Sequence, residues 1–231
     1  MHYVGDELEL FSIAVNWKAR LRRELAPHIR GHVLEVGAGI GSTTRALRGP
    51  SATAWTCLEP DPRMCATLRS AEWGAGPSVD VLQGTVAALA SESRFDTILY
   101  IDVLEHIADD RAETERVAAH VRPGGRLVVV APAHQWLYSP FDAAVGHFRR
   151  YDRKSLRSVV PAWLIERSCR YIDSVGLLAS FANRAILRGR QPNKAQLLLW
   201  DRLFVRASRV ADTALAGRVG KTIVGVWEVP E

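Results

Sequence analysis

The sequence predicts an α/β protein with a Rossmann-like, doubly wound and mostly parallel seven-stranded sheet, preceded by an N-terminal helix. Up to Pro132, short apolar runs alternate with helical patterns, which is the rhythm of consecutive βαβ units. The runs at 97–101 and 126–130 are almost entirely apolar, as expected for parallel strands buried on both faces. The first run, 33–36, leads into three closely spaced glycines. Together these observations favour a parallel sheet with helices on both faces.

The first half of the chain supplies five of the expected strands. Apolar residues recur at helical spacing over 7–29, and Pro27 and Gly31 end this segment. The run Pro123-Gly124-Gly125 is expected to end the helix before the fifth strand. The expected strands are 33–36, 53–58, 79–82, 97–101 and 126–130, separated by helices at about 42–48, 62–72, 86–91 and 111–120.

After Pro132 the rhythm changes. A helix is expected at 152–160, a strand at 164–171, helical structure over 175–216 and a last strand at 222–228. Because the helical insert 175–216 lies between the last two strands, we expect it to cover the ligand edge of the sheet as a lid. We interpret residues 1–231 as one domain with an N-terminal helical cap (1–31), a cofactor-binding core (32–132) and an acceptor-side half (133–231).

Composition narrows the class of protein. The net charge of +5 comes from 30 basic against 25 acidic residues, which are scattered, so no nucleic-acid partner is expected. Three cysteines are too few for a disulfide framework. The N-terminal residues do not resemble a signal peptide, and no run of about 18 apolar residues suggests stable membrane insertion. We therefore expect a cytoplasmic protein that is a monomer or a homodimer.

The glycine loop identifies the kind of ligand. A dinucleotide fingerprint would need glycine at position 42, which is Ser42. The pattern is instead Glu35-x-Gly37-x-Gly39-x-Gly41, which resembles motif I of the class I S-adenosylmethionine-dependent methyltransferases. The resemblance implies that Glu35 faces the methionine end of the cofactor and that Gly37, Ala38, Gly39 and Gly41 form the loop against it.

Two further turns fit a ribose and an adenine. Glu59, followed by Pro60, comes at the end of the second strand, where a carboxylate can accept both ribose hydroxyls. This position suits NAD and adenosylmethionine equally. Gly84 and Thr85 follow the third strand, and in the resembled family such residues contact the adenine.

The segment 95–107 is the most specific part of the resemblance. Its run Asp102-Val103-Leu104-Glu105-His106-Ile107 is similar to the strand-4 motif of small-molecule methyltransferases, in their ubiquinone-pathway-like branch. The resemblance implies that Asp102, Val103 and His106 line the cofactor near its sulfonium, with Asp102 and His106 able to share one helical face. In the N-terminal helix, Trp17 either closes over the cofactor or packs in the core.

A second concentration of polar and aromatic side chains spans 131–151. It resembles a bacterial methyltransferase subgroup with a Gly-His-x-Arg-Arg-Tyr segment, here 146–151. His134 or His147 is the candidate general base. Arg149 and Arg150 could pair with an acidic acceptor, or could instead form a structural clamp with Asp142 or Asp152 while Tyr151 lies in the core. The candidate acceptor-binding residues are Trp136, Tyr138, Arg149, Arg150 and Tyr151.

The sequence thus predicts methyl transfer from S-adenosylmethionine to an oxygen or nitrogen of a small molecule: a metabolite, a sugar or a natural product. The product of the cofactor is S-adenosylhomocysteine. No metal is expected, because the histidines and acids lack ligand spacing. Two alternatives stay open: a methyltransferase-fold protein that catalyses another step, such as cyclisation, and a membrane-surface enzyme with a lipid-like acceptor, in which 175–210 is interfacial.

Overall fold

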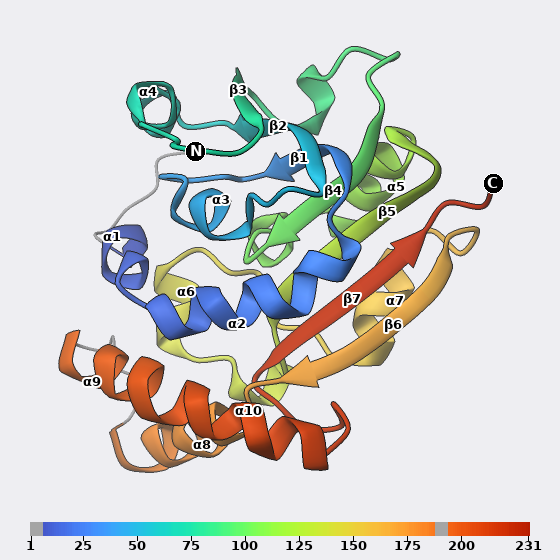
Figure 1. Cartoon of the computed structure of the whole chain (residues 1–231). Helices are drawn as coiled ribbons and strands as arrows, with labels where there is room; N and C mark the ends of the chain where they lie inside the picture. The colour runs from blue at the N-terminus through green and yellow to red at the C-terminus, as the bar shows by residue number, and fades with distance from the viewer. Residues whose placement is uncertain (1–6, 188–193) are drawn as a thin grey trace.

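The computed structural model describes residues 7–187 and 194–231 and contains a seven-stranded sheet in the order β3-β2-β1-β4-β5-β7-β6 (Figure 1). Strands β1 to β5 are parallel, and β7 is antiparallel to both of its neighbours. This arrangement confirms the predicted Rossmann-like, mostly parallel fold. The strands are β1 (Gly31–Val36), β2 (Ala52–Glu59), β3 (Ser78–Gln83), β4 (Phe95–Ile101), β5 (Val121–Pro132), β6 (Ile165–Ile172) and β7 (Thr222–Glu228).

Helices cover both faces of the sheet because successive strand residues point to opposite sides. Val33 of β1 packs with α2, α3 and α4, whereas Leu34 packs with α5 and α7. Apolar residues of β4 and β5 alternate between the same two cores. The helices are α1 (Glu7–Ser12), α2 (Val15–Leu25), α3 (Ser42–Leu47), α4 (Pro62–Ser70), α5 (Asp110–Ala118), α6 (Pro140–Ala144), α7 (Arg153–Val159), α8 (Ser174–Leu187), α9 (Lys194–Leu199) and α10 (Val205–Ala214).

The register of the sheet brings three loops to one edge. Val36, the last residue of β1, lies beside Leu58 of β2 and Tyr100 of β4. The three strands therefore end nearly level, and the segments that begin at Gly37 and Asp102 meet Glu59 at their carboxyl ends. A parallel α/β sheet binds ligands at this edge.

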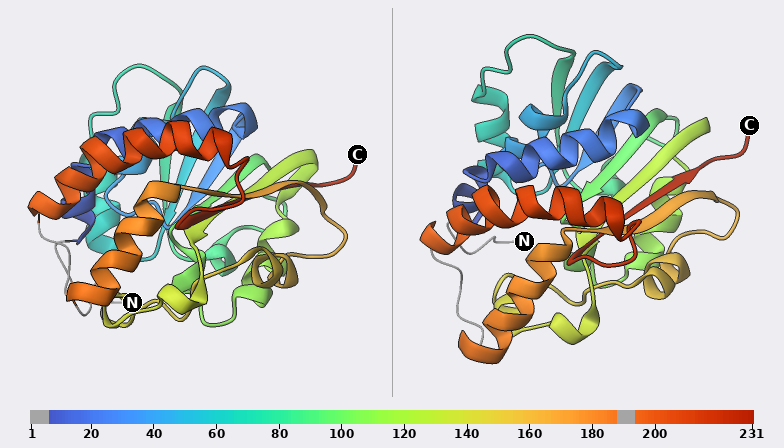
Figure 2. Two further views of the ribbon diagram at one scale, coloured as in Figure 1. Left: turned by 90° about the horizontal axis from the view of Figure 1, so that it is seen from below. Right: turned by 60° about the horizontal axis from the view of Figure 1, so that its bottom comes forward.

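The helical insert before β7 lies against the N-terminal helix. Figure 2 shows α10 running alongside α2, with α8 beside α10. A π-helical segment, Trp200–Phe204, joins α9 to α10, and its Asp201 accepts hydrogen bonds from the backbone N–H groups of Asn16 and Trp17 at the start of α2. The part of the predicted helical insert at 188–193 lies outside the described residues.

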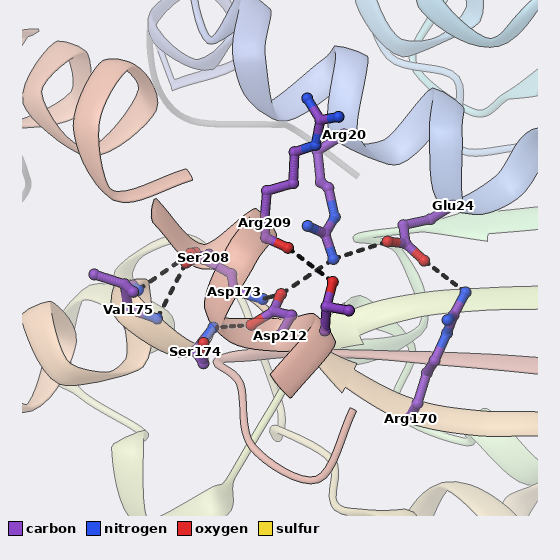
Figure 3. Close-up of polar contacts among 11 residues, drawn as sticks. Arg20, Glu24, Arg170, Asp173, Ser174, Val175, Ser208, Arg209 and Asp212 are labelled. Atoms are coloured by element: carbon purple, nitrogen blue, oxygen red, sulfur yellow. Dashed lines mark hydrogen bonds and ion pairs between the residues drawn. The ribbon is translucent and has the colours of Figure 1, made fainter. Parts of the chain in front are cut away.

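A buried carboxylate completes this attachment (Figure 3). Asp212 of α10 accepts backbone hydrogen bonds from Asp173 (2.8 Å) and Ser174 (2.9 Å) at the start of α8. It also pairs with Arg20 of α2 at 3.1 Å, and Arg20 in turn pairs with Glu24 at 2.8 Å. One acidic side chain therefore connects three helices that are far apart in the sequence.

Three local expectations are wrong. The segment 7–29 is not one helix, because a turn at Ile13 and Ala14 separates α1 from α2. Pro123-Gly124-Gly125 lies inside β5 rather than before it, because Val121 already pairs with Phe95 of β4 and the register shifts after it. No helix carries both Asp102 and His106: Asp102 has a φ of +54°, and the following 3₁₀ turn is only Leu104–His106.

Among the described residues, no helix is both long enough and apolar enough to cross a membrane.

Candidate active site

A cavity of about 1310 Å³ opens at the carboxyl ends of β1, β2 and β4. Residues of α8, α9 and the π-helical segment line its far side, as expected for a lid. Of the predicted cofactor residues, Gly41 alone is outside the lining. Those that line the cavity are Trp17, Glu35, Gly37, Ala38, Gly39, Glu59, Pro60, Gly84, Thr85, Asp102, Val103 and His106.

Two positions of the loop require glycine because a side chain there would collide with a different neighbour in each case. At Gly37 φ is +67°, and a Cβ would lie 2.6 Å from Val103 Cγ2, so a side chain here would push against the cavity wall. At Gly41 φ is +75°, and a Cβ would lie 2.6 Å from the Trp73 ring. Gly41 therefore lets α3 begin close to the Trp73 side chain, and Gly37 lets the loop pack closely against Val103.

Glu59 ties the glycine loop to the end of β2. Its Oε2 accepts a hydrogen bond from Gly39 N (2.8 Å), and its Oε1 accepts one from Asp61 N (3.0 Å). Burial raises the pKa of Glu59, and these hydrogen bonds act in the opposite direction. Both carboxylate oxygens are thus held in fixed positions at the cavity wall, where the sequence predicts the ribose.

Glu35 lies below the loop, inside β1. Its Oε2 accepts hydrogen bonds from Thr44 Oγ1 (2.7 Å) and Trp55 Nε1 (2.9 Å). Burial nevertheless raises the pKa of Glu35 to about 7. The carboxyl group is therefore held ready to lose its proton near neutral pH when a cation approaches.

The raised pKa of Glu35 gives a first prediction. Between about pH 4.5 and 7 the folded protein keeps a proton that the unfolded chain has lost, so the free energy of unfolding falls as pH rises through this window. Glu35→Gln removes that contribution. In urea unfolding at about pH 5 and about pH 8, the variant should lose less stability than the wild type over the interval. The exposed control Glu115→Gln should keep the wild-type difference, and an equal pH dependence in Glu35→Gln contradicts the prediction.

A second polar group of the cavity lining consists of Glu105, His106 and His147. Glu105 is fully buried, and neither oxygen of its carboxylate has a hydrogen-bond partner among the described residues. His147 Nε2 lies 3.9 Å from Glu105 Oε1, and the His106 and His147 rings meet edge to face at 4.5 Å. Burial raises the pKa of Glu105 well above its usual value, raises that of Asp102 to about 6 and lowers that of His106 to about 4.

Asp142 fixes the orientation of His147. Its Oδ1 is 2.9 Å from His147 Nδ1, and Arg150 donates to both carboxylate oxygens at 2.8 and 3.0 Å. Burial would raise the pKa of Asp142, but the hydrogen bonds from His147 and Arg150 hold it well below its usual range. Because an ionised carboxylate only accepts, His147 carries its proton on Nδ1 in this arrangement, and its Nε2 faces Glu105.

The predicted acceptor-side residues divide into two groups. His147, Tyr138 and Arg150 line the cavity, whereas His134, Trp136, Arg149 and Tyr151 do not. His134 has a φ of +67°, places Nε2 2.9 Å from Gly220 O and stacks on Tyr171. Its geometry does not favour a role as general base. Trp136 lies beside His134 and is half exposed.

Arg149 and Tyr151 take part in a clamp. Arg149 pairs with Asp110 at the start of α5, and the buried Tyr151 donates its hydroxyl to the same carboxylate at 2.7 Å. Asp152 instead caps α7 through Ser155 N. The predicted clamp is therefore confirmed for Arg150, which pairs with Asp142, and for the buried Tyr151, whereas Arg149 pairs with Asp110 rather than with Asp142 or Asp152.

Sequence reasoning missed four charged residues of the cavity besides Glu105, namely Lys18, Asp61, Glu113 and Lys221. Lys221 precedes β7, lies 3.9 Å above the Trp200 ring and is 3.4 Å from Asp173 Oδ2. Burial lowers the pKa of Lys221, and Asp173 opposes this shift. Lys18 of α2 also lines the cavity. The position of Lys221 at the start of the last strand was the available signal, since that strand runs antiparallel and begins at the ligand edge.

The comparisons with known proteins agree with this geometry. Residues 34–127 match a family model described as a methyltransferase domain. The chain is 36% identical over 126 residues to a ubiquinone biosynthesis O-methyltransferase of Azotobacter vinelandii, covering 52% of this chain and 50% of that protein. The corresponding protein of Xanthomonas euvesicatoria is 37% identical over 175 residues, covering 68% and 71%. The chain thus spans about half the length of the first relative and 71% of the length of the second.

A solved structure with the same fold contains a bound ligand. The N-methyltransferase NodS of Bradyrhizobium japonicum, in complex with S-adenosylhomocysteine, matches 94% of this chain and 86% of its own with a TM-score of 0.54. At 15% sequence identity this match shows the fold alone.

Proposed function

The chain belongs to the class I S-adenosylmethionine-dependent methyltransferases, and we propose that it transfers a methyl group from that cofactor to an oxygen atom of a small-molecule acceptor. One observation carries the proposal: a single cavity joins the glycine loop and Glu59 to the polar group of Glu105, His106 and His147. The first end suits the cofactor, and the second end lies where an acceptor hydroxyl would meet the methyl group. The curated relatives are O-methyltransferases, which favours oxygen over nitrogen and methyl transfer over cyclisation.

The residues of this chain would have the following roles in binding and methyl transfer. Glu59 binds the ribose, Gly84 and Thr85 lie against the adenine, and Glu35 faces the methionine end. Asp102 stabilises the positive sulfonium. In the reaction the acceptor oxygen would attack the methyl carbon in line and lose its proton to Nε2 of His147, while the carbon–sulfur bond breaks and its electron pair remains on sulfur. Holding the two reactants in this geometry supplies most of the acceleration.

The rest of the cavity indicates an acceptor with an apolar body. A typical ligand pocket has about 300–1,000 Å³, so this cavity has room for a cofactor and a second molecule. The wall away from the glycine loop is mostly apolar and includes Phe11, Leu137, Phe141, Leu197, Leu199 and Phe204. Such a wall suits an aromatic or hydrocarbon acceptor better than a sugar.

Cofactor binding tests the proposal first. In calorimetric titrations, S-adenosylmethionine and S-adenosylhomocysteine should bind in roughly the micromolar range and NAD should not. Glu59→Gln should weaken both sulfur ligands by about 10- to 100-fold, because it removes charge-assisted hydrogen bonds to the ribose. Glu72→Gln, an exposed acid nearby, should bind like the wild type. Binding of NAD alone, or of none of the three, rejects the proposal.

Turnover then identifies the acceptor class. Release of S-adenosylhomocysteine should depend on an added phenol or catechol with an apolar substituent. A cyclase that only holds the cofactor would release none with any acceptor. The cytoplasmic location, the lack of a nucleic-acid partner and the monomeric or homodimeric state stay predictions.

A lipid-like acceptor at a membrane surface is the second candidate. Large apolar side chains of the lid are exposed: Leu178, Phe181, Leu199, Leu203 and Val210. Leu199 also lines the cavity, so apolar surface continues from the lid into the site. Co-sedimentation with anionic liposomes should occur if this candidate holds, and its absence leaves the freely diffusing acceptor.

A further inference from the structure

We propose that Lys221 binds a carboxylate group of the acceptor, so that the substrate is a hydroxylated aromatic acid. Lys221 directly precedes β7 and lines the cavity together with Gly176 and Trp200 of the lid. Because β7 runs antiparallel to β5, its first residues lie at the ligand edge of the sheet. This assignment rests on the proposed methyl transfer, since it names the substrate class of the same site.

Asp173 does not use up the ammonium group of Lys221. Its Oδ1 accepts hydrogen bonds from Ser208 Oγ (2.7 Å) and Gly176 N (3.1 Å), and its Oδ2 accepts one from Trp200 Nε1 (2.8 Å). The Lys221 Nζ lies farther away, at 3.4 Å from Oδ2. The lid thus satisfies both oxygens of this carboxylate without the lysine. Asp173 therefore positions the ammonium beside the cavity and engages at most one of its donors.

The ammonium has a donor left for a ligand. Lys221 Nζ lies 3.9 Å from the centre of the Trp200 ring, which covers one side of it. An ammonium has three N–H donors, so Asp173 and the ring face leave a third. The Lys221 side chain is 24% exposed, and the space that it lines is the cavity. Because a largely buried charge that lacks partners is costly, binding of an anionic group at this donor is favoured.

The bound cofactor should strengthen this preference for an anion. Burial lowers the pKa of Lys221, Asp173 and Asp102 raise it, and Arg150 lowers it. In the proposed complex the sulfonium neutralises Asp102, which removes one of the two carboxylates that stabilise the ammonium. A carboxylate on the acceptor replaces it. The acid should therefore bind more tightly to the cofactor complex than to the free protein.

The surrounding charges narrow the substrate class. Burial raises the pKa of Asp102, and both His147 and Lys221 oppose this shift, so the proposed base and the ammonium lie at the same end of the cavity. An aromatic ring with a hydroxyl for His147 and a carboxylate for Lys221 uses both groups. A phosphate, with nearly two negative charges, is less suitable, because Asp102 and Asp173 both act on the ammonium.

A matched acid and amide test the site without a known substrate. The full chain is first saturated with sinefungin, an analogue of S-adenosylmethionine whose amine keeps the positive charge and which cannot transfer a methyl group. In calorimetric titrations, 6-hydroxy-2-naphthoate should then bind at least about tenfold more tightly than 6-hydroxy-2-naphthamide, because only the acid forms a charge-assisted contact with the ammonium. With S-adenosylhomocysteine, which is uncharged at sulfur, the preference for the acid should be smaller.

Variants of Lys221 show whether this side chain causes the preference. Lys221→Met removes the charge and should abolish the preference for the acid, whereas Lys221→Arg should retain part of it. Lys154→Met, at an exposed position of α7, is the matched control and should show the wild-type preference. In turnover of the acid, Lys221→Met should raise KM by about tenfold and change kcat by less than about threefold, because Lys221 binds the substituent and not the attacking oxygen.

The outcomes separate this inference from the proposed function. Asp173 keeps its other hydrogen bonds in Lys221→Met, so the variant should fold, and circular dichroism verifies this. Equal binding of the acid and the amide by the wild type, an undiminished preference in Lys221→Met, or no binding of either compound overturns the inference. Titration with S-adenosylhomocysteine alone tests the cofactor site, and Lys221→Met should bind it like the wild type. A wild type that binds S-adenosylhomocysteine without preferring the acid refutes the substrate class and leaves the proposed methyl transfer intact.

Discussion

Replacing Asp212 by alanine is expected to lower the free energy of unfolding by about 3–5 kcal/mol. The substitution removes the partner of Arg20 and leaves the backbone N–H groups of Asp173 and Ser174 without their acceptor at the start of α8 (Figure 3). All of these groups are buried, so water cannot replace the carboxylate. The loss is a large fraction of the stability of a domain of this size.

Urea unfolding measures this change, and the melting temperature should fall by roughly 10 °C. Glu115→Ala is the matched control, because it removes an exposed acid from α5 and should change stability by less than about 0.5 kcal/mol. Asp212→Asn keeps one acceptor oxygen and should lie between the two. If Asp212→Ala is as stable as the control, the carboxylate does not hold the lid against α2.

The cofactor end of the site was predictable because its chemistry is local in the sequence. The glycine loop directly follows β1, Glu59 ends β2 and Asp102 follows β4, so a parallel sheet brings them together by its topology alone. The same argument placed Gly84 and Thr85 after β3. To place each residue at the site, it was enough to assign the strand that precedes it, and the strands are recognisable in the sequence as apolar runs.

The acceptor end depends on contacts that no local pattern records. Arg150 was a candidate for pairing with Asp142, and it does so. Arg149, its neighbour, pairs instead with Asp110 of α5, because the two side chains of consecutive residues in an extended segment point in opposite directions. Glu105 meets His147 only after the segment 133–150 has folded back over β4.

Backbone conformation explains the remaining differences between the predicted and the observed positions of site residues. The positive φ of His134 turns its ring toward Gly220 and away from the cavity. The positive φ of Asp102 breaks the run that would have placed it on one helix with His106. Positive φ at non-glycine residues is uncommon, so propensity alone gives no warning of it.

Replacing Asp142 by alanine is expected to affect the two ends of the cavity unequally. The residue is fully buried and accepts hydrogen bonds from Arg150, His147 and Ser139, so its loss should lower the free energy of unfolding by about 3–5 kcal/mol. It should also release His147 from its orientation and lower the turnover of the acceptor by about 10- to 100-fold. The glycine loop and Glu59 belong to other elements, so the affinity for S-adenosylmethionine should change by less than about threefold.

Three measurements on one variant distinguish these effects: urea unfolding, release of S-adenosylhomocysteine with an acceptor, and calorimetry with S-adenosylmethionine. Asp152→Ala is the matched control, since it removes an exposed capping acid from the same segment and should cost about 1 kcal/mol without changing the turnover. Asp142→Asn preserves the volume and gives a folded comparison if the alanine variant is too unstable. Unchanged turnover in Asp142→Asn and Asp142→Ala would show that His147 needs no carboxylate to orient it. A parallel loss of cofactor affinity would show that the two ends of the cavity are one cooperative unit, coupled through the contact between the His147 and His106 rings.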